Sequence, residues 1–309
     1  MQFTNLVNQS SDMNRQNLGM SNDNVPKLKK QSPNLYFDTK SVRNSIICVL
    51  IGSIGFTSVL IILSPDDKKV IICDIIEPLA AAIAVGLSAL VIYRQKTDGL
   101  MGKAYTILGV GLALFLIAEI IWSYYEIALE IENPFPSIAH ALWLIGYGPI
   151  LYFVFKMYRF FGASNSRTHQ LFVSLAGAVF LAYLIFGIAQ TADFTTQEHI
   201  TSFIISISYP TLDIILLIPA ALIILNPMKG ELTSIPWIFL AILIMSVGDS
   251  AFAYSSNVIA LQKMNWVWNL FFVTSYFVAS AGLFWHNRFF IYDNKEKSKS
   301  HFTERSGRY

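Results

Sequence analysis

The sequence predicts an all-α, polytopic membrane protein with eight transmembrane helices. The first observation is compositional: 54% of the residues are hydrophobic and only 14% are charged, whereas soluble domains carry about 25% charged residues. The second is the presence of eight apolar segments with the length of about 20 residues that crosses a bilayer. These segments lie near 44–64, 70–93, 104–129, 136–160, 169–190, 203–226, 234–256 and 265–290.

The chain begins with a polar segment. Residues 1–43 are rich in Asn, Gln and Ser and contain no apolar core, so we expect a disordered tail. This segment also lacks the apolar stretch of a cleaved signal peptide. A second, short charged tail follows the last span, at 291–309.

The distribution of Lys and Arg predicts the orientation. With the N-terminus inside, nineteen of the 22 Lys and Arg residues fall on the inner side, and only Lys68, Lys69 and Lys263 fall in outer loops. Basic residues concentrate in cytoplasmic loops. We therefore predict a multi-pass protein of the cell membrane with both termini in the cytoplasm.

The two halves of the chain resemble each other. The second, third and fourth spans align with the sixth, seventh and eighth at nearly constant offset, with Pro78 matching Pro210, Glu119 matching Asp249, and Tyr147 matching Tyr276. We predict two tandem four-helix repeats, 44–163 and 164–290. Four is an even number, so both repeats have the same orientation and are related by an axis along the membrane normal.

Polar and aromatic residues recur on the predicted inner faces of the helices. Charged groups inside a membrane usually face the bundle interior or a wet cavity. Glu119 and Asp213 lie roughly 15 Å below the predicted outer end, and His140 about one turn below it. The candidates for a ligand or proton pocket are Glu77, Glu119, Tyr124, His140, Trp143, Tyr147, Tyr209, Asp213, Asp249, Asn269 and Tyr276.

These residues predict an outward-facing polar and aromatic pocket. The middles of the spans contain no Lys or Arg to neutralise the acids, so we expect the pocket to be sensitive to external pH. The alternative is that the acids and His140 only join helices, satisfied by Tyr and Ser hydroxyls.

Metal, cofactor and nucleic-acid binding are not expected. The two cysteines, Cys48 and Cys73, form no CxxC or Cys/His spacing, so we expect two buried free thiols and neither a zinc site nor a disulfide. The sequence contains no nucleophile elbow, HExxH or P-loop, and we assign no catalytic residue.

The stretch WSYYEIALEIENPFPSIAHALWLIGY, which begins at Trp122, resembles the multi-helix membrane input region of prokaryotic diguanylate cyclases and histidine kinases. Tyr209, Pro210 and Asp213 of the sixth span and Asp249 of the seventh are similar to that family as well. The resemblance implies a sensor. Two features depart from the family pattern: His140 stands where the family has Asp, and we expect no output domain after residue 290.

A more distant resemblance is to the lysoplasmalogenase-like eight-helix membrane family, which has acids where Glu119 and Asp249 stand here. It implies a lipid hydrolase. We therefore predict a non-enzymatic sensor or ligand-binding module, with a lipid hydrolase and a small-solute or proton-coupled transporter as open alternatives. The expected partners are membrane lipids, a cytoplasmic signalling protein in trans and, as a further alternative, a second copy in a homodimer.

Overall fold

The computed structural model describes residues 33–97, 99–131, 134–161, 166–192, 194–225, 235–257 and 265–292. Every regular element in these ranges is a helix, and eight helices are long and apolar enough to cross a membrane, as predicted. The α-helices are α2 (Pro33–Leu63), α3 (Asp66–Gln95), α4 (Gly99–Ser123), α5 (Ile138–Phe161), α6 (Arg167–Thr191), α7 (Gln197–Leu225), α8 (Ile235–Asn257) and α9 (Asn265–Trp285). Two π-helical turns, η2 (Tyr124–Ala128) and η5 (His286–Tyr292), continue α4 and α9.

The chain divides into two compact units, Met1–Ile47 and Cys48–Tyr309. In the first unit only residues 33–47 are described, and they are helical. The predicted disordered tail, 1–43, is therefore too long at its C-terminal end, because α2 already begins at Pro33. Proline suits the first turn of a helix, where its missing N–H has no partner to lose. The rest of that tail and residues 293–309 lie outside the described residues.

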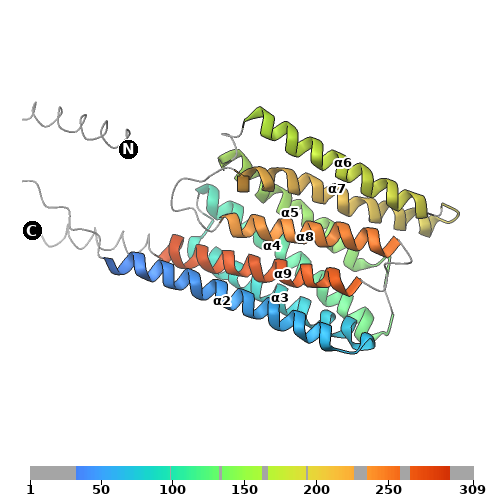
Figure 1. Ribbon diagram of the computed structural model, residues 1–309, viewed down its shortest axis with the longest axis horizontal. Helices are drawn as coiled ribbons and strands as arrows, with labels where there is room; N and C mark the ends of the chain where they lie inside the picture. Colours follow the sequence, from blue (N-terminus) through green and yellow to red (C-terminus); the bar gives the residue numbers. More distant parts are fainter. Residues whose placement is uncertain are drawn as a thin grey trace, which may run out of the picture. The chain divides into compact units, whose positions relative to one another are not determined.

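Six helices of the second unit pack as a closed ring in the order α3, α4, α5, α7, α8, α9 and back to α3. Helix α6 packs on α7 and α8, at the upper edge of the view in Figure 1. The main core fills the ring from one helix to the next, with Phe115, Phe153, Met157 and Phe239 fully or almost fully buried. Since consecutive helices run antiparallel, α3, α5, α7 and α9 begin at one end, called here the predicted outer end.

Helix packing in the ring has pairwise counterparts in the two halves of the chain. Contact of α4 with α5 corresponds to contact of α8 with α9, and α3 with α4 corresponds to α7 with α8. Contact of α3 with α9 corresponds to α7 with α5. The flanking helices differ, since α6 packs on α7 while Leu50 of α2 packs beside Ala241 and Val278 of α8 and α9. The tandem repeat agrees with the ring and stays a prediction.

The flanking helices turn most of their side chains outward. Only 11% of the span residues of α2 and α6 are buried, against 50% for α4. Their exposed side chains are large and apolar, for example Phe56 and Phe172, as expected of helix faces that contact lipid. Cys48 is exposed on α2 while Cys73 is buried. The expectation of two buried thiols is therefore wrong for Cys48, because α2 leaves most of its surface uncovered.

Candidate functional site

A group of acids and aromatic residues from all six ring helices meets inside the ring. We call it the acid–tyrosine network, and it comprises Glu77, Glu119, Trp143, Tyr147, Tyr209, Asp213, Asp249 and Tyr276. All eight were predicted site residues. Helical phase places each of them on the inner face of its own helix, and the ring brings these faces together.

The first part of the network lies around Glu119 on α4. The hydroxyl of Tyr276 on α9 donates to Glu119 Oε1 at 2.7 Å. The indole N–H of Trp143 and the carboxyl group of Glu77 are also hydrogen-bonded to Glu119. Two carboxyl groups can share a hydrogen bond only when one of them is protonated. The Glu77–Glu119 contact therefore brings together two carboxyl groups that can share one proton.

The second part lies around Tyr147 on α5. Its hydroxyl oxygen is 2.7 Å from Asp213 Oδ1 on α7 and 2.8 Å from Asp249 Oδ2 on α8. Ser250 donates to the other oxygen of Asp213 at 3.0 Å. A phenol has a single hydrogen to donate, so it can donate to one carboxyl group and must accept from the other. The three residues thus share a proton as well.

The two parts are related by the same matches that link the two halves of the sequence. Tyr276 of the second half bonds Glu119 of the first, and Tyr147 of the first half bonds Asp249 of the second. Contacts between aromatic side chains repeat in the same way. Trp122 and Trp143 have centroids 5.6 Å apart, and the matching Phe252 and Phe272 have centroids 6.3 Å apart.

His140 lies beside the network and caps a helix. Its Nδ1 accepts a hydrogen bond from the backbone N–H of Ser137 at 3.2 Å and is 3.0 Å from Ser137 Oγ. Ser137 immediately precedes α5, so His140 occupies the position from which Glu or Gln closes a capping box. Because Nδ1 accepts this bond, it carries no proton.

Aromatic rings surround the His140 imidazole on several sides. Ring centroids lie at 4.5 Å for Phe135, 5.5 Å for both Trp122 and Trp143, and 6.2 Å for Tyr209. Trp143 and Tyr209 belong to the network, so His140 contacts the network through rings rather than through a hydrogen bond to an acid.

A third acid pair, absent from the predicted candidates, lies toward the outer end. The carboxyl groups of Asp74 on α3 and Glu126 on η2 are hydrogen-bonded to each other. The hydroxyl of Ser123 contacts the backbone of both helices, since it lies 2.6 Å from the main-chain carbonyl oxygen of Asp74 and 2.8 Å from that of Glu119. The spacing of Glu119 and Glu126 on one helix face was the available signal for it.

Besides His140, two predicted residues lie outside the network. Tyr124 has 57% of its surface exposed and contacts the ring of Tyr125. It begins the π-helical turn η2, and it lies five residues after Glu119, so helical geometry puts it on a different face from that acid. Asn269 is hydrogen-bonded to the thiol of Cys73 rather than to an acid.

The network packs tightly. A cavity of about 20 Å³ touches Tyr147, Asp213 and Ser246 and is otherwise lined by apolar side chains such as Phe115 and Ile242. This volume holds about one water molecule. Three buried oxygens in or beside the network lack a hydrogen-bond partner: Asp74 Oδ2, Glu77 Oε1 and the hydroxyl of Tyr209. The residues that the structure describes contain no group of acids, His or Cys suited to a metal ion.

Comparison with known protein families, with curated proteins and with solved structures finds no match. The interpretation of the site therefore rests on its own geometry.

Proposed function

We propose that the protein is a non-enzymatic membrane sensor module whose acid–tyrosine network responds to protons from the predicted outer side. One observation carries the proposal. The hydroxyl of Tyr147 lies between Asp213 and Asp249, an arrangement that requires a shared proton. The proton holds α5, α7 and α8 together, so its loss would change how these helices pack.

Proton loss acts through electrostatics. Without the shared proton, Asp213 and Asp249 would be two neighbouring carboxylates in a medium of low polarity, where like charges repel far more strongly than in water. The other titratable groups that interact with them are Glu119, Tyr147, Tyr209 and Tyr276. No Lys or Arg of the described residues forms an ion pair with these acids. A protonation step there therefore favours one of two packing arrangements.

The size of the cavity supports a sensor over a hydrolase or a transporter. Room for about one water beside Asp213 does not accommodate a lipid substrate. Toward the opposite end from the predicted outer end, Ile150, Leu216 and Ile242 line this cavity and offer no polar path for a solute. The acids also contact tyrosines rather than an open cleft.

The signal would leave at the cytoplasmic end, toward a signalling protein in trans. There Arg94 donates to Asn287 Oδ1 at 3.2 Å, and His286 Nε2 lies 2.9 Å from Gln95 Oε1. These contacts join the end of α3 to η5. A change in ring packing would reach the surface that these residues form.

The test measures conformation against pH in reconstituted protein. Spin-label distances between the cytoplasmic ends of α5 and α8 are recorded from pH 5 to 8 in the wild type and in the double variant Asp213→Asn, Asp249→Asn, whose amides supply their own donors. Glu198→Gln, at the exposed start of α7, is the matched control. We expect a pH-dependent distance change in the wild type and control that the double variant lacks. An identical pH response in all three proteins contradicts the proposal.

A further inference from the structure

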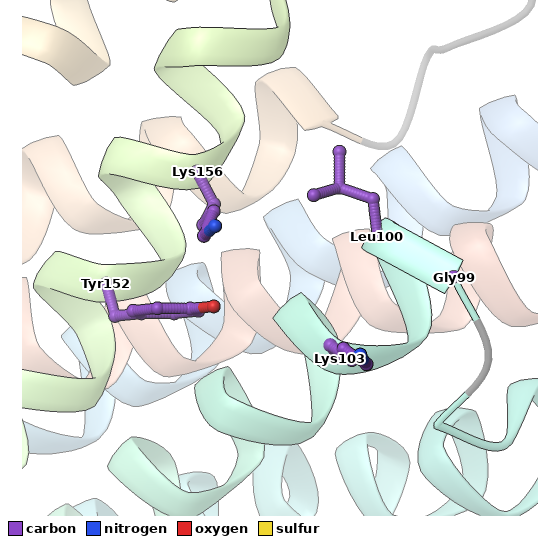
Figure 2. Close-up of a pocket in the computed structure, with 5 residues that line it drawn as sticks. All are labelled: Gly99, Leu100, Lys103, Tyr152 and Lys156. Carbon is purple, nitrogen blue, oxygen red and sulfur yellow. The ribbon is translucent and has the colours of Figure 1, made fainter.

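We infer that a cavity between α4 and α5, at the end opposite the predicted outer end, binds the phosphate of an anionic glycerophospholipid. The cavity has a volume of about 350 Å³ and is lined by Gly99, Leu100, Lys103, Tyr152 and Lys156. This volume lies in the range of ligand pockets. Figure 2 shows Tyr152 and Lys156 reaching from α5 toward the first turns of α4, where Leu100 and Lys103 lie. The site is separate from the acid–tyrosine network and does not depend on the proposed function.

The charge of the cavity selects an anion. Both lysines line it, and neither forms a salt bridge with a carboxylate of the described residues. The ammonium of Lys156 lies 5.3 Å from the centre of the Tyr152 ring, within the range of a cation–π contact that holds the side chain on this side of α5. Two lysines that line one cavity favour a phosphate, which has oxygens enough to accept from both ammonium groups.

The start of α4 adds a second kind of donor. Gly99 and Leu100 are the first residues of a 25-residue helix, and the first N–H groups of a helix have no acceptor within it. Such N–H groups and the helix dipole favour a phosphate. Gly99 itself has a positive φ of 68°, a conformation that glycine adopts without strain.

The surroundings of the cavity favour a lipid over a soluble phosphate. Leu100 and Tyr152 are 39% and 41% exposed at the surface of membrane-spanning helices, so the cavity has an apolar flank on which an acyl chain can lie. Lys103 is one turn from the start of α4, and Lys156 is little more than one turn from the end of α5. These positions match the depth of lipid headgroups, and basic pockets between helices on the cytoplasmic side bind anionic headgroups.

The experiment compares lipid binding by the full chain in nanodiscs. Native mass spectrometry measures the affinity for phosphatidylglycerol and for phosphatidylcholine in the wild type and in the double variant Lys103→Gln, Lys156→Gln. The matched control is Arg159→Gln, Arg167→Gln, which removes two exposed cations from the same end of the bundle. We expect the wild type and the control to prefer phosphatidylglycerol, and the double variant to bind it roughly 30-fold more weakly, as two surface lysines imply.

Two further arms make the result decisive. Inorganic phosphate and glycerol 3-phosphate are added to wild-type protein in phosphatidylcholine nanodiscs, and thermal stability is measured. Saturating stabilisation by either soluble anion would overturn the assignment to a lipid. Equal phosphatidylglycerol affinity in the two double variants would overturn the site itself. If the lysine variant does not fold, the salt dependence of wild-type affinity decides. Binding of a phosphate by lysines that salt can reach is weakened by screening, so a salt-independent preference contradicts the inference.

Discussion

Two of the three tyrosines of the network, Tyr147 and Tyr276, differ in the number of acids to which they are hydrogen-bonded. Tyr276 contacts one acid, Glu119, which also bonds Glu77 and Trp143. Tyr147 lies between two acids, Asp213 and Asp249. Matched positions in the two halves thus carry similar groups with different bonding. At the Glu119 site the two acids contact each other directly, whereas at the Tyr147 site the phenol lies between them. The difference implies that the Tyr147 site is the more sensitive to loss of a single hydroxyl.

Replacing Tyr147 by Phe should produce the largest effect. The change removes two hydrogen bonds and leaves Asp213 and Asp249 buried with fewer donors, so we expect a loss of about 3–5 kcal/mol in the free energy of unfolding. Tyr276→Phe removes one such bond and should cost about 2 kcal/mol. Unfolding in mixed micelles measures both values. Equal losses in the two variants would show that the sites do not differ in this respect.

Adding a methyl group at Gly146 should disturb the Tyr147 site without removing a polar group. A Cβ at this position would lie 2.6 Å from the ring of Phe115, and that ring contacts Tyr147 with centroids 5.7 Å apart. We expect Gly146→Ala to lower the free energy of unfolding by about 2 kcal/mol.

Gly148 on the same helix provides the control for that variant. A Cβ there has no neighbour within 4 Å, so Gly148→Ala should not destabilise the protein, and a loss as large as that of Gly146→Ala would contradict the packing argument. The same unfolding measurement serves for both.

The pH dependence of the free energy of unfolding should report the number of protons that each of the two sites holds. Folded protein holds a shared proton at Asp213 and Asp249, whereas unfolded aspartates are ionised at neutral pH. The folded state then binds more protons, and stability falls as pH rises. The slope is about 1.4 kcal/mol per pH unit for each such proton. Asp249→Asn should therefore reduce the slope of unfolding free energy against pH by the contribution of one proton.

Glu77→Gln should remove the corresponding share at the Glu119 site, because an amide donates without a shared proton. Unfolding free energies measured at several values between pH 5 and 8 give the slopes. An unchanged slope in both variants would mean that neither site holds the proton.

The smallest effect is expected at His140, which contacts both sites only through rings. His140→Ala removes the acceptor for the Ser137 N–H and should cost about 1 kcal/mol, as loss of a helix cap does. Gln suits the same capping position, so His140→Gln should retain most of the stability in thermal unfolding. A larger loss in the Gln variant would point to a role for the imidazole beyond capping.

The fold could be predicted from the sequence because span length and apolar composition are set by the bilayer. The inner faces could be predicted too, since Trp143 and Tyr147, for example, follow helical spacing. The partner of each residue could not. The contact of Tyr276 with Glu119 depends on α9 closing the ring against α3 and α4, and no local pattern encodes that order.

The positions of two candidate residues have physical causes as well. Tyr124 lies five residues after Glu119, which at about 3.6 residues per turn puts it on a different face of the helix from that acid, and its side chain is exposed. His140 lies among aromatic rings, and its position three residues after Ser137 also makes it the cap of α5. The predicted open pocket required space between the side chains, and the described cavity at the network holds about one water.

Closure of the ring by its last helix has a consequence for biogenesis. Glu119 and Tyr276 are 157 residues apart in the chain, so the ribosome delivers the acid to the bilayer long before its phenol. Until the final span is inserted, a nascent chain carries Glu119 without that partner. The translocation machinery or lipid headgroups must then supply the hydrogen bonds or water contacts that the carboxyl group needs. Truncation before α9 would therefore yield a substrate for quality-control proteases, and separately synthesised halves would regain a complete ring only by meeting in the same membrane.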